Sequence, residues 1–166
     1  MQSRGLSLVE MIVVTSIVSI LLAIATLGFN ELSRRYRSEA QTRLLFSEIL
    51  KARNNAICQR RATRVKLYPG RFEVYSSQAD DSRGAGPLQT QDLSFPITCS
   101  DDSWNRAKGY SIDFGRDGIA LQKISVCLEE GQGAGSVDSI KISATRVSIG
   151  KKDRGDDCDD ESITIR

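Results

Sequence analysis

The sequence predicts an α+β fold in which one long N-terminal helix packs against a small C-terminal antiparallel β-sheet domain. Residues 6–29 are almost entirely apolar, which is typical of a membrane-spanning helix. Apolar residues then recur at helical spacing within residues 30–60, which predicts an amphipathic continuation of that helix. Within residues 61–166 they alternate with polar residues, as expected of a β-rich globular domain.

The composition argues against an enzyme. The chain has 166 residues, of which 40% are hydrophobic and 27% charged, so it is expected to bury one modest core. It contains no His, which removes the commonest general base and metal ligand, and with them Ser/His and Cys/His nucleophile pairs. The formal net charge of +2 gives no chain-wide sign of a polyanion-binding protein. We expect a non-enzymatic protein without a cofactor.

The first element is predicted to cross a membrane. Residues 6–29 carry a single charged side chain, that of Glu10. As a helix that rises about 1.5 Å per residue, this stretch would reach roughly 36 Å, enough to cross a hydrocarbon core of roughly 30 Å. A cleaved secretory signal would have a shorter apolar stretch and a small-x-small cleavage site. The segment is therefore expected to stay in the mature protein.

The second half of the helix is predicted to form part of the core. An apolar stripe runs along one helical face, at the spacing i, i+4, i+7 and i+11, and consists of Leu45, Ile49, Ala52 and Ala56. Such a stripe requires a partner, which the following strands can supply. Residues 6–58 would then form one helix of roughly 80 Å.

Alternating apolar residues predict several short strands. The stretch from Val65 to Val74, with Pro69-Gly70 at its centre, is typical of a hairpin in which the glycine takes a positive φ. Further strands are expected at Tyr110, Ile112 and Phe114, at Ile119 and Leu121, at Ile124, Val126 and Leu128, and in a terminal hairpin at Ile140, Ile142, Val147 and Ile149. Loops are expected around residues 77–91 and 129–136.

Charge and cysteine content give opposite indications of the membrane orientation. Residues 31–60 hold seven basic and three acidic groups, and the positive-inside rule would place such a segment in the cytoplasm. Four cysteines follow the apolar run, an even number that favours an oxidising compartment for that part of the chain.

The N-terminal residues resolve this conflict. The chain begins Met-Gln-Ser-Arg-Gly-Leu-Ser-Leu-Val-Glu before its apolar run. This resembles the prepilin signature of type IV pilins and of type II secretion pseudopilins. The resemblance implies a leader at residues 1–5, cleavage between Gly5 and Leu6 by a prepilin peptidase on the cytoplasmic side, and N-methylation of Leu6. It also implies a single-pass inner-membrane protein with a periplasmic globular domain, which passes through a pilus assembly platform into a fibre.

The same motif gives Glu10 a role in assembly. A lone charged side chain in a bilayer costs about 2.5 to 3.5 kcal/mol on insertion scales, so it is expected to lie near the interface or to find a partner. The resemblance supplies one, the new amine of Leu6 on a neighbouring subunit. Leu27 stands where major pilins usually have a helix-bending Pro, and we therefore expect a straighter first helix.

Two later stretches resemble GspH/FimT-type minor pilins and pseudopilins, and with them the pilin fold. Residues 44–57 contain the Ala-Arg-x-x-Ala-Ile helix end of that group, and residues 112–118 resemble the strand and turn that precede its last sheet. The resemblance implies a minor type IV pilin that contacts other pilin subunits through its N-terminal helix. An H-type minor pseudopilin of a type II secretion system is the alternative, and a DNA receptor at a pilus tip is a third hypothesis.

The four cysteines predict two disulfides, although zinc binding and free thiols are alternatives. Four cysteines allow three pairings. The terminal hairpin favours a bond between Cys127 and Cys158, which leaves Cys58 to pair with Cys99.

Two charged stretches near the C-terminus are weaker candidates for binding. A calcium ion could be held by the carboxylates of Asp156, Asp157, Asp159 and Asp160, although acidic clusters are usually solvated. DNA-binding relatives carry Gly-Arg-x-Arg in the last hairpin, and this chain has Thr145 and a single Arg there. The residues that could contact nucleic acid are Arg146, Lys151, Lys152 and Arg154, but the adjacent acids would repel phosphate, so DNA binding is not favoured.

Overall fold

The computed structural model describes residues 7–129, 135–153 and 155–166. The chain divides into two compact units between Arg35 and Tyr36. One long helix, α1 (Leu8–Gln59), runs through the boundary between them. The long N-terminal helix predicted from the sequence is therefore confirmed, and it continues without interruption past residue 27.

The second half of α1 forms part of the core of the unit Tyr36–Arg166. All four residues of the predicted stripe are almost completely buried, with exposed fractions between 0% and 2%: Leu45, Ile49, Ala52 and Ala56. They share a single apolar cluster with side chains from two β-sheets. The helical spacing thus correctly predicted which face of α1 is covered.

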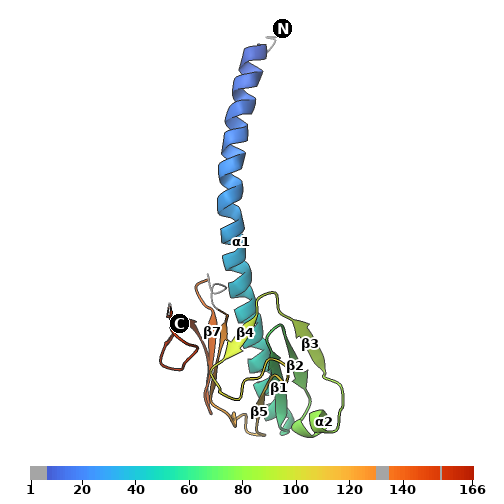
Figure 1. The fold of residues 1–166 in the computed structure, drawn as a ribbon. Coiled ribbons are helices and arrows are strands. Elements are labelled where there is room, and N and C mark those ends of the chain that lie inside the picture. The colour runs from blue at the N-terminus through green and yellow to red at the C-terminus, as the bar shows by residue number, and fades with distance from the viewer. Residues whose placement is uncertain (1–6, 130–134, 154) are drawn as a thin grey trace. The chain divides into compact units, whose positions relative to one another are not determined.

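The first sheet has four strands in the order β3-β2-β1-β5, all of them antiparallel (Figure 1). Its strands are β1 (Thr63–Tyr68), β2 (Arg71–Tyr75), β3 (Gln89–Asp92) and β5 (Tyr110–Phe114). The predicted hairpin around Pro69-Gly70 is confirmed, with Tyr68 opposite Arg71. Gly70, however, does not adopt a positive φ, so that detail of the turn was wrong.

The second sheet has five antiparallel strands in the order β4-β6-β7-β8-β9. Its strands are β4 (Ile97–Cys99), β6 (Ile124–Leu128), β7 (Ser139–Ile142), β8 (Val147–Lys152) and β9 (Ile163–Ile165). The predicted terminal hairpin corresponds to β7 and β8. Its inner face adds Val126, Ile140 and Ile142 to the core cluster.

The structure differs from the sequence prediction in the number of sheets and in several short elements. The sequence predicted one sheet and a loop over residues 77–91, but that stretch contains a short helix, α2 (Gln78–Ser82), and the start of β3. Ile119 and Leu121 belong to no strand, and only an isolated bridge joins Phe114 to Ala120. The strands β3, β4 and β9 were missed because each has only three or four residues, too few for alternation to be recognised.

Three side chains make four hydrogen bonds that fix the second half of α1 against the strands and loops. The amide of Gln41 donates from Nε2 to the carbonyl oxygen of Phe95 (2.6 Å) and accepts at Oε1 from its backbone N–H (2.9 Å). Thr63 Oγ1 donates to the Ala52 carbonyl oxygen at 2.9 Å. Arg53 Nε donates to the Gly118 carbonyl oxygen, also at 2.9 Å. These bonds satisfy backbone groups that packing would otherwise bury without a partner.

Truncating the stripe should destabilise the protein. We expect Ile49→Ala to lower the free energy of unfolding by about 2 to 5 kcal/mol, because it removes a fully buried side chain and leaves a cavity. Thermal unfolding of the full chain in detergent would measure this loss. Leu44→Ala, at an exposed position of the same helix, is the control and should change stability by less than about 0.5 kcal/mol. Equal effects of the two substitutions would contradict the packing described here.

Candidate functional site

The unit that ends at Arg35 presents an exposed apolar helical surface. The first half of α1 contains a window with a mean hydropathy of 2.5 of which nothing is buried, and by length and composition it can cross a membrane. Its exposed large apolar side chains are Leu8, Val9, Met11, Ile12, Val13, Val14, Ile17, Val18, Ile20, Leu21, Leu22, Ile24, Phe29 and Leu32. An apolar surface of this extent is normally covered by lipid or by protein.

Three hydroxyl groups in this helix half bond within the helix itself. Thr15 Oγ1 donates to the Met11 carbonyl oxygen at 2.9 Å, and Ser19 Oγ donates to the Thr15 carbonyl oxygen at 2.7 Å. Ser16 Oγ donates to the Ile12 carbonyl oxygen at 2.7 Å. Polar groups without water must find such internal partners. These hydroxyls are therefore compatible with an apolar surrounding.

Glu10 is the exception in this helix half. It lies exposed in the first turn of α1, where the helix dipole favours a negative charge. Among the residues that the structure describes, none forms an ion pair or hydrogen bond with its carboxylate. Gly5 and Leu6, the predicted cleavage and methylation positions, lie outside the described residues. The carboxylate is thus available to a group supplied by another molecule.

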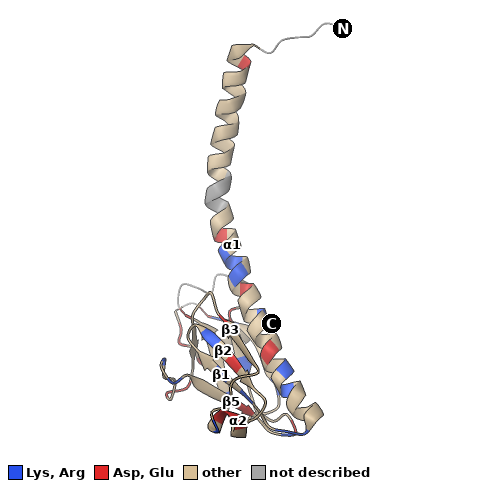
Figure 2. Ribbon diagram, turned by 90° about the vertical axis from the view of Figure 1, so that its right-hand side faces the viewer, with Lys and Arg blue, Asp and Glu red and all other residues tan. Residues whose placement is uncertain are grey.

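The character of α1 changes at Glu31. From there on charged residues replace the apolar surface, as Figure 2 shows by the appearance of blue and red along the helix. Ion pairs along the helix join Glu31 to Arg35 and, at 2.8 Å, Glu39 to Arg43. Surface pairs of this kind contribute little stability, but they keep this part of the helix hydrated.

One of the two predicted disulfides is present. Cys127 on β6 and Cys158 are bonded, with their Cα atoms 5.9 Å apart. The prediction of a second disulfide, between Cys58 and Cys99, is wrong, because both residues are free thiols. Cys99 is the last residue of β4 and belongs to the core cluster, whereas Cys58 is exposed on α1 near the end of the helix. Burial raises the pKa of the Cys99 thiol, which keeps it protonated and unreactive.

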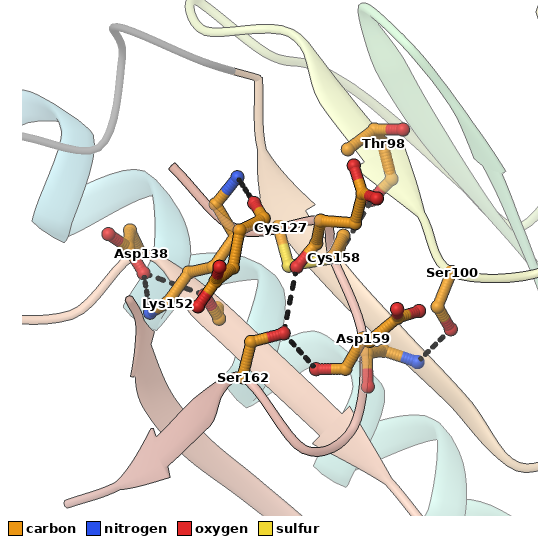
Figure 3. Close-up of a disulfide and its surroundings, with 12 residues drawn as sticks. Thr98, Ser100, Cys127, Asp138, Lys152, Cys158, Asp159 and Ser162 are labelled. Carbon is orange, nitrogen blue, oxygen red and sulfur yellow. Dashed lines mark hydrogen bonds between the residues drawn. A yellow bond between two sulfur atoms is a disulfide. The ribbon is translucent and has the colours of Figure 1, made fainter. Parts of the chain in front are cut away.

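The disulfide fastens an acidic segment, residues 156–161, to the outer face of the second sheet (Figure 3). Asp160 in that segment accepts ion pairs from Lys123 (2.5 Å) and Lys141 (2.7 Å). Burial opposes ionisation of Asp160, but these two lysines hold its pKa below the ordinary value. Lys152 Nζ donates to the Asp156 carbonyl oxygen at 2.8 Å. The segment is thus held at Asp156, at Cys158 and at Asp160.

The weak calcium candidate has no support in this geometry. Within the described ranges, no group of three or more acidic, cysteine or histidine side chains converges as a metal site would require. Asp160 is already neutralised by two lysines. Asp156, Asp157 and Asp159 lie exposed along the segment.

The candidate nucleic-acid residues do not form one patch. Arg146 lies in the turn before β8, whereas Lys151 and Lys152 lie at the other end of that strand, roughly 17 Å away at about 3.3 Å per residue. Lys151 Nζ donates to the Gly135 carbonyl oxygen at 2.6 Å, so both ammonium groups are engaged. Arg154 lies outside the described residues. Phosphate contact requires cations in one surface, which these residues do not provide.

Sequence reasoning missed a buried ionic network on the outer face of the first sheet. Arg64 binds Asp113 through two hydrogen bonds of 2.6 and 2.8 Å, and it also binds Asp81 at 2.7 Å. Lys66 reaches the other oxygen of Asp81 at 2.6 Å. The hydrogen bonds that Arg64 donates to Asp113 outweigh burial and raise the pKa of Arg64. The alternation of Arg64 and Lys66 with buried residues in β1 was the available signal.

Comparisons with known proteins bear on both parts of the chain. Residues 1–26 match the family described as the prokaryotic N-terminal methylation motif. No curated protein matches the chain. The chain is similar to a crystal structure of the type IV minor pilin FimU of Pseudomonas aeruginosa, with 15% identity, a TM-score of 0.50, and coverage of 71% of this chain and 91% of that one. A second crystal form of FimU gives 18% identity, a TM-score of 0.47, and coverage of 67% and 90%. At these identities the likeness is one of fold.

Removing the disulfide should loosen the acidic segment. We expect Cys158→Ser to lower the free energy of unfolding by about 2 to 4 kcal/mol and to expose the bond after Glu161 to a glutamate-specific protease. Unfolding curves and timed digestion of the full chain would measure the two effects. Cys58→Ser, at an exposed free thiol, is the control and should change neither. Unchanged protease resistance in Cys158→Ser would show that the ion pairs of Asp160 suffice to hold the segment.

Glu39 should contribute to stability in a defined pH range. Hydrogen bonds from the hydroxyl of Ser136, from Arg43 and from the backbone N–H of Ser136 lower the pKa of Glu39 from 4.5 to about 2. Because the folded-state pKa is the lower one, this contribution is fully present above pH 4.5 and is lost as the pH falls towards about 2. In acid unfolding experiments, Glu39→Gln should therefore lose stability at pH 6 and show a shallower decline below pH 4.5. Parallel pH curves for the two proteins would contradict this assignment.

Proposed function

Since the chain is a type IV pilin-like protein, we propose that it serves as a minor subunit of a type IV pilus, built into the fibre through the first half of α1. The observation that carries the proposal is the exposed apolar surface of that helix half, which bears the carboxylate of Glu10, without a partner among the described residues. In a bilayer the surface is covered by lipid, and in a fibre it is covered by the helices of neighbouring subunits.

The proposal includes a membrane stage before assembly. The first half of α1 anchors the protein in the inner membrane, and the globular unit lies in the periplasm. The disulfide between Cys127 and Cys158 supports this compartment, because such bonds persist in oxidising surroundings. A prepilin peptidase removes residues 1–5 on the cytoplasmic side, and an assembly platform then moves the subunit into the fibre.

Cleavage creates the partner for Glu10. Removal of residues 1–5 leaves a positively charged amine on Leu6, four residues before Glu10. Glu10 lies in the first turn of α1. The prepilin resemblance assigns it the amine of a neighbouring subunit, which it would meet once helices pack side by side. An ion pair surrounded by apolar helices is strengthened by the low dielectric constant, and leaving either charge unpaired there is costly. This pairing sets the axial register between subunits.

The alternative is an H-type minor pseudopilin of a type II secretion system. The N-terminal methylation motif supports both versions equally. Deletion of the gene distinguishes them, because loss of surface pili with normal protein secretion supports the pilus, and the reverse result supports the secretion system. Neighbouring genes for pilus assembly or for secretion give a cheaper first answer.

The mature N-terminus provides the first test. We expect mass spectrometry of the protein from cells with a prepilin peptidase to find a chain that begins at Leu6 and carries one N-methyl group. Cells without the peptidase should retain Met1. Retention of Met1 in both strains would overturn the proposed processing.

The second test concerns Glu10. We expect Glu10→Ala to insert into the inner membrane as well as the parent does, because removing a charge makes insertion easier, but to be absent from sheared fibres. Immunoblots of membrane and fibre fractions would measure both. Glu31→Ala, which removes an exposed carboxylate on the same helix, is the matched control and should enter fibres normally. Equal incorporation of the two variants would contradict the role given to Glu10.

A further inference from the structure

A pocket of about 360 Å³ with a basic wall lies where α1 ends and the first sheet begins. Its wall includes Arg60 and Arg61, which directly follow α1, and Arg116 from the turn after β5. Ser77 and Gln78, at the start of α2, complete the polar part of the wall. None of these residues takes part in the role proposed above for the first half of α1.

Two of the three arginines in the pocket carry an uncompensated charge. Arg61 is neutralised by Asp80 at 2.8 Å and is also bonded to Ser77 at 3.1 Å. The guanidinium groups of Arg60 and Arg116 have no hydrogen bond or ion pair with any residue in the described part of the chain. The pocket is therefore suited to a carboxylate, which a guanidinium group can bind through two parallel hydrogen bonds.

Arg60 occupies a backbone position at which glycine would be less strained. The helix ends in a Schellman motif, with the N–H of Arg61 bonded to the Ala56 carbonyl oxygen (3.2 Å) and that of Arg60 to the Ile57 carbonyl oxygen (3.3 Å). Arg60 has a φ of 49°, the one positive φ of a non-glycine residue in the described ranges. Helices usually place glycine here because a Cβ is unfavourable. A strained arginine that forms no contact in its own fold indicates a role for its side chain outside that fold.

The acidic segment, residues 156–161, carries a negative charge that complements the basic wall of the pocket. Asp156, Asp157, Asp159 and Glu161 are exposed, and no ion pair joins them to any described residue. The disulfide and the two lysines that bind Asp160 hold the segment in place, which reduces the entropy lost when it binds. The segment comes just before β9 and the C-terminus, whereas the pocket wall includes the start of α2. The C-terminus and α2 lie on opposite sides of the globular unit in Figure 1, so the segment and the pocket wall are far apart within one copy.

We propose that the pocket lined by Arg60, Arg61 and Arg116 binds the acidic segment 156–161 of a second copy of this chain. The contact is head-to-tail, because the segment and the pocket lie on opposite sides of the globular unit and do not both face the same neighbour, so contacts continue from copy to copy rather than closing on a dimer. It deepens the proposed function and rests on it, because anchoring in a membrane or fibre is what brings copies close together.

The size of the pocket and the nature of the contact determine how strong it can be. A pocket of about 360 Å³ that binds a few charged side chains is small compared with a stable interface, so free copies should associate weakly. Anchoring in one membrane raises the effective concentration and makes such a contact significant. Because the charges are exposed, the contact should weaken as salt increases.

Disulfide cross-linking of the full chain in native inner membranes tests the contact. Cys58 is an exposed free thiol two residues before Arg60, so it reports directly on the pocket. With Glu161→Cys we expect a ladder of dimers and larger species on non-reducing gels after mild oxidation, with Cys58 linked to the new thiol by peptide mapping and the bond between Cys127 and Cys158 intact. Thr145→Cys, exposed in the turn before β8, is the matched control and should give no ladder. A ladder in both variants, or a product that stops at a dimer joined through Cys58, would overturn the proposal.

Charge and strain variants then separate binding from folding. In the Glu161→Cys background, Arg60→Glu should reduce the ladder about tenfold, and adding Asp157→Arg and Asp159→Arg should restore it. Arg60→Gly should also reduce the ladder while raising the unfolding temperature, because it relieves the positive φ. An unchanged ladder in Arg60→Gly would overturn the proposal. If Glu10→Ala abolishes fibres but leaves the membrane ladder intact, the two proposals stand separately. If the Glu161→Cys protein enters fibres but gives no ladder, only the proposed head-to-tail contact is overturned.

Discussion

The fold of the globular unit depends on one constraint, which is that a single apolar face of α1 has to cover two sheets. The stripe formed by Leu45, Ile49, Ala52 and Ala56 contributes to a core that also contains Val65 from the first sheet and Ile140 from the second. Small side chains at two of the four positions allow strands to approach the helix closely. The Gln41 amide then bonds both backbone groups of Phe95 in the link between β3 and β4, which is where the chain passes from one sheet to the other.

Because both sheets place their inner faces on the same helix, their outer faces need another solution. Each is covered by a short polar segment rather than by a second apolar layer. On the first sheet, Asp81 of α2 binds Arg64 and Lys66. On the second, Asp160 binds Lys123 and Lys141, and the disulfide adds a covalent attachment. Buried ion pairs are only weakly stabilising when they replace apolar contacts, but losing one partner is costly, so these networks fix the position of each segment.

The same helix has two surfaces suited to different surroundings. Before Glu31 its large apolar side chains are exposed, and the hydroxyls of Thr15, Ser16 and Ser19 bond within the helix, which suits an apolar surrounding. After Glu31 one face is charged and the other buried. Charge in this chain is accordingly concentrated at particular surfaces, with basic residues where α1 ends and acidic ones before β9. The proposed head-to-tail contact uses this separation.

The sequence by itself determined the features that depend on neighbours along the chain. The apolar run, the stripe on α1 and the hairpins at Pro69-Gly70 and at β7–β8 follow from local periodicity, which backbone geometry fixes within a few residues. The N-terminal motif likewise pointed to Glu10 without any tertiary information. Only the tertiary structure decided that there are two sheets, that Cys58 and Cys99 remain apart, and that Arg64 meets Asp113. The two residue pairs are 41 and 49 positions apart in the sequence, so whether they meet depends on strand order and register rather than on local preference.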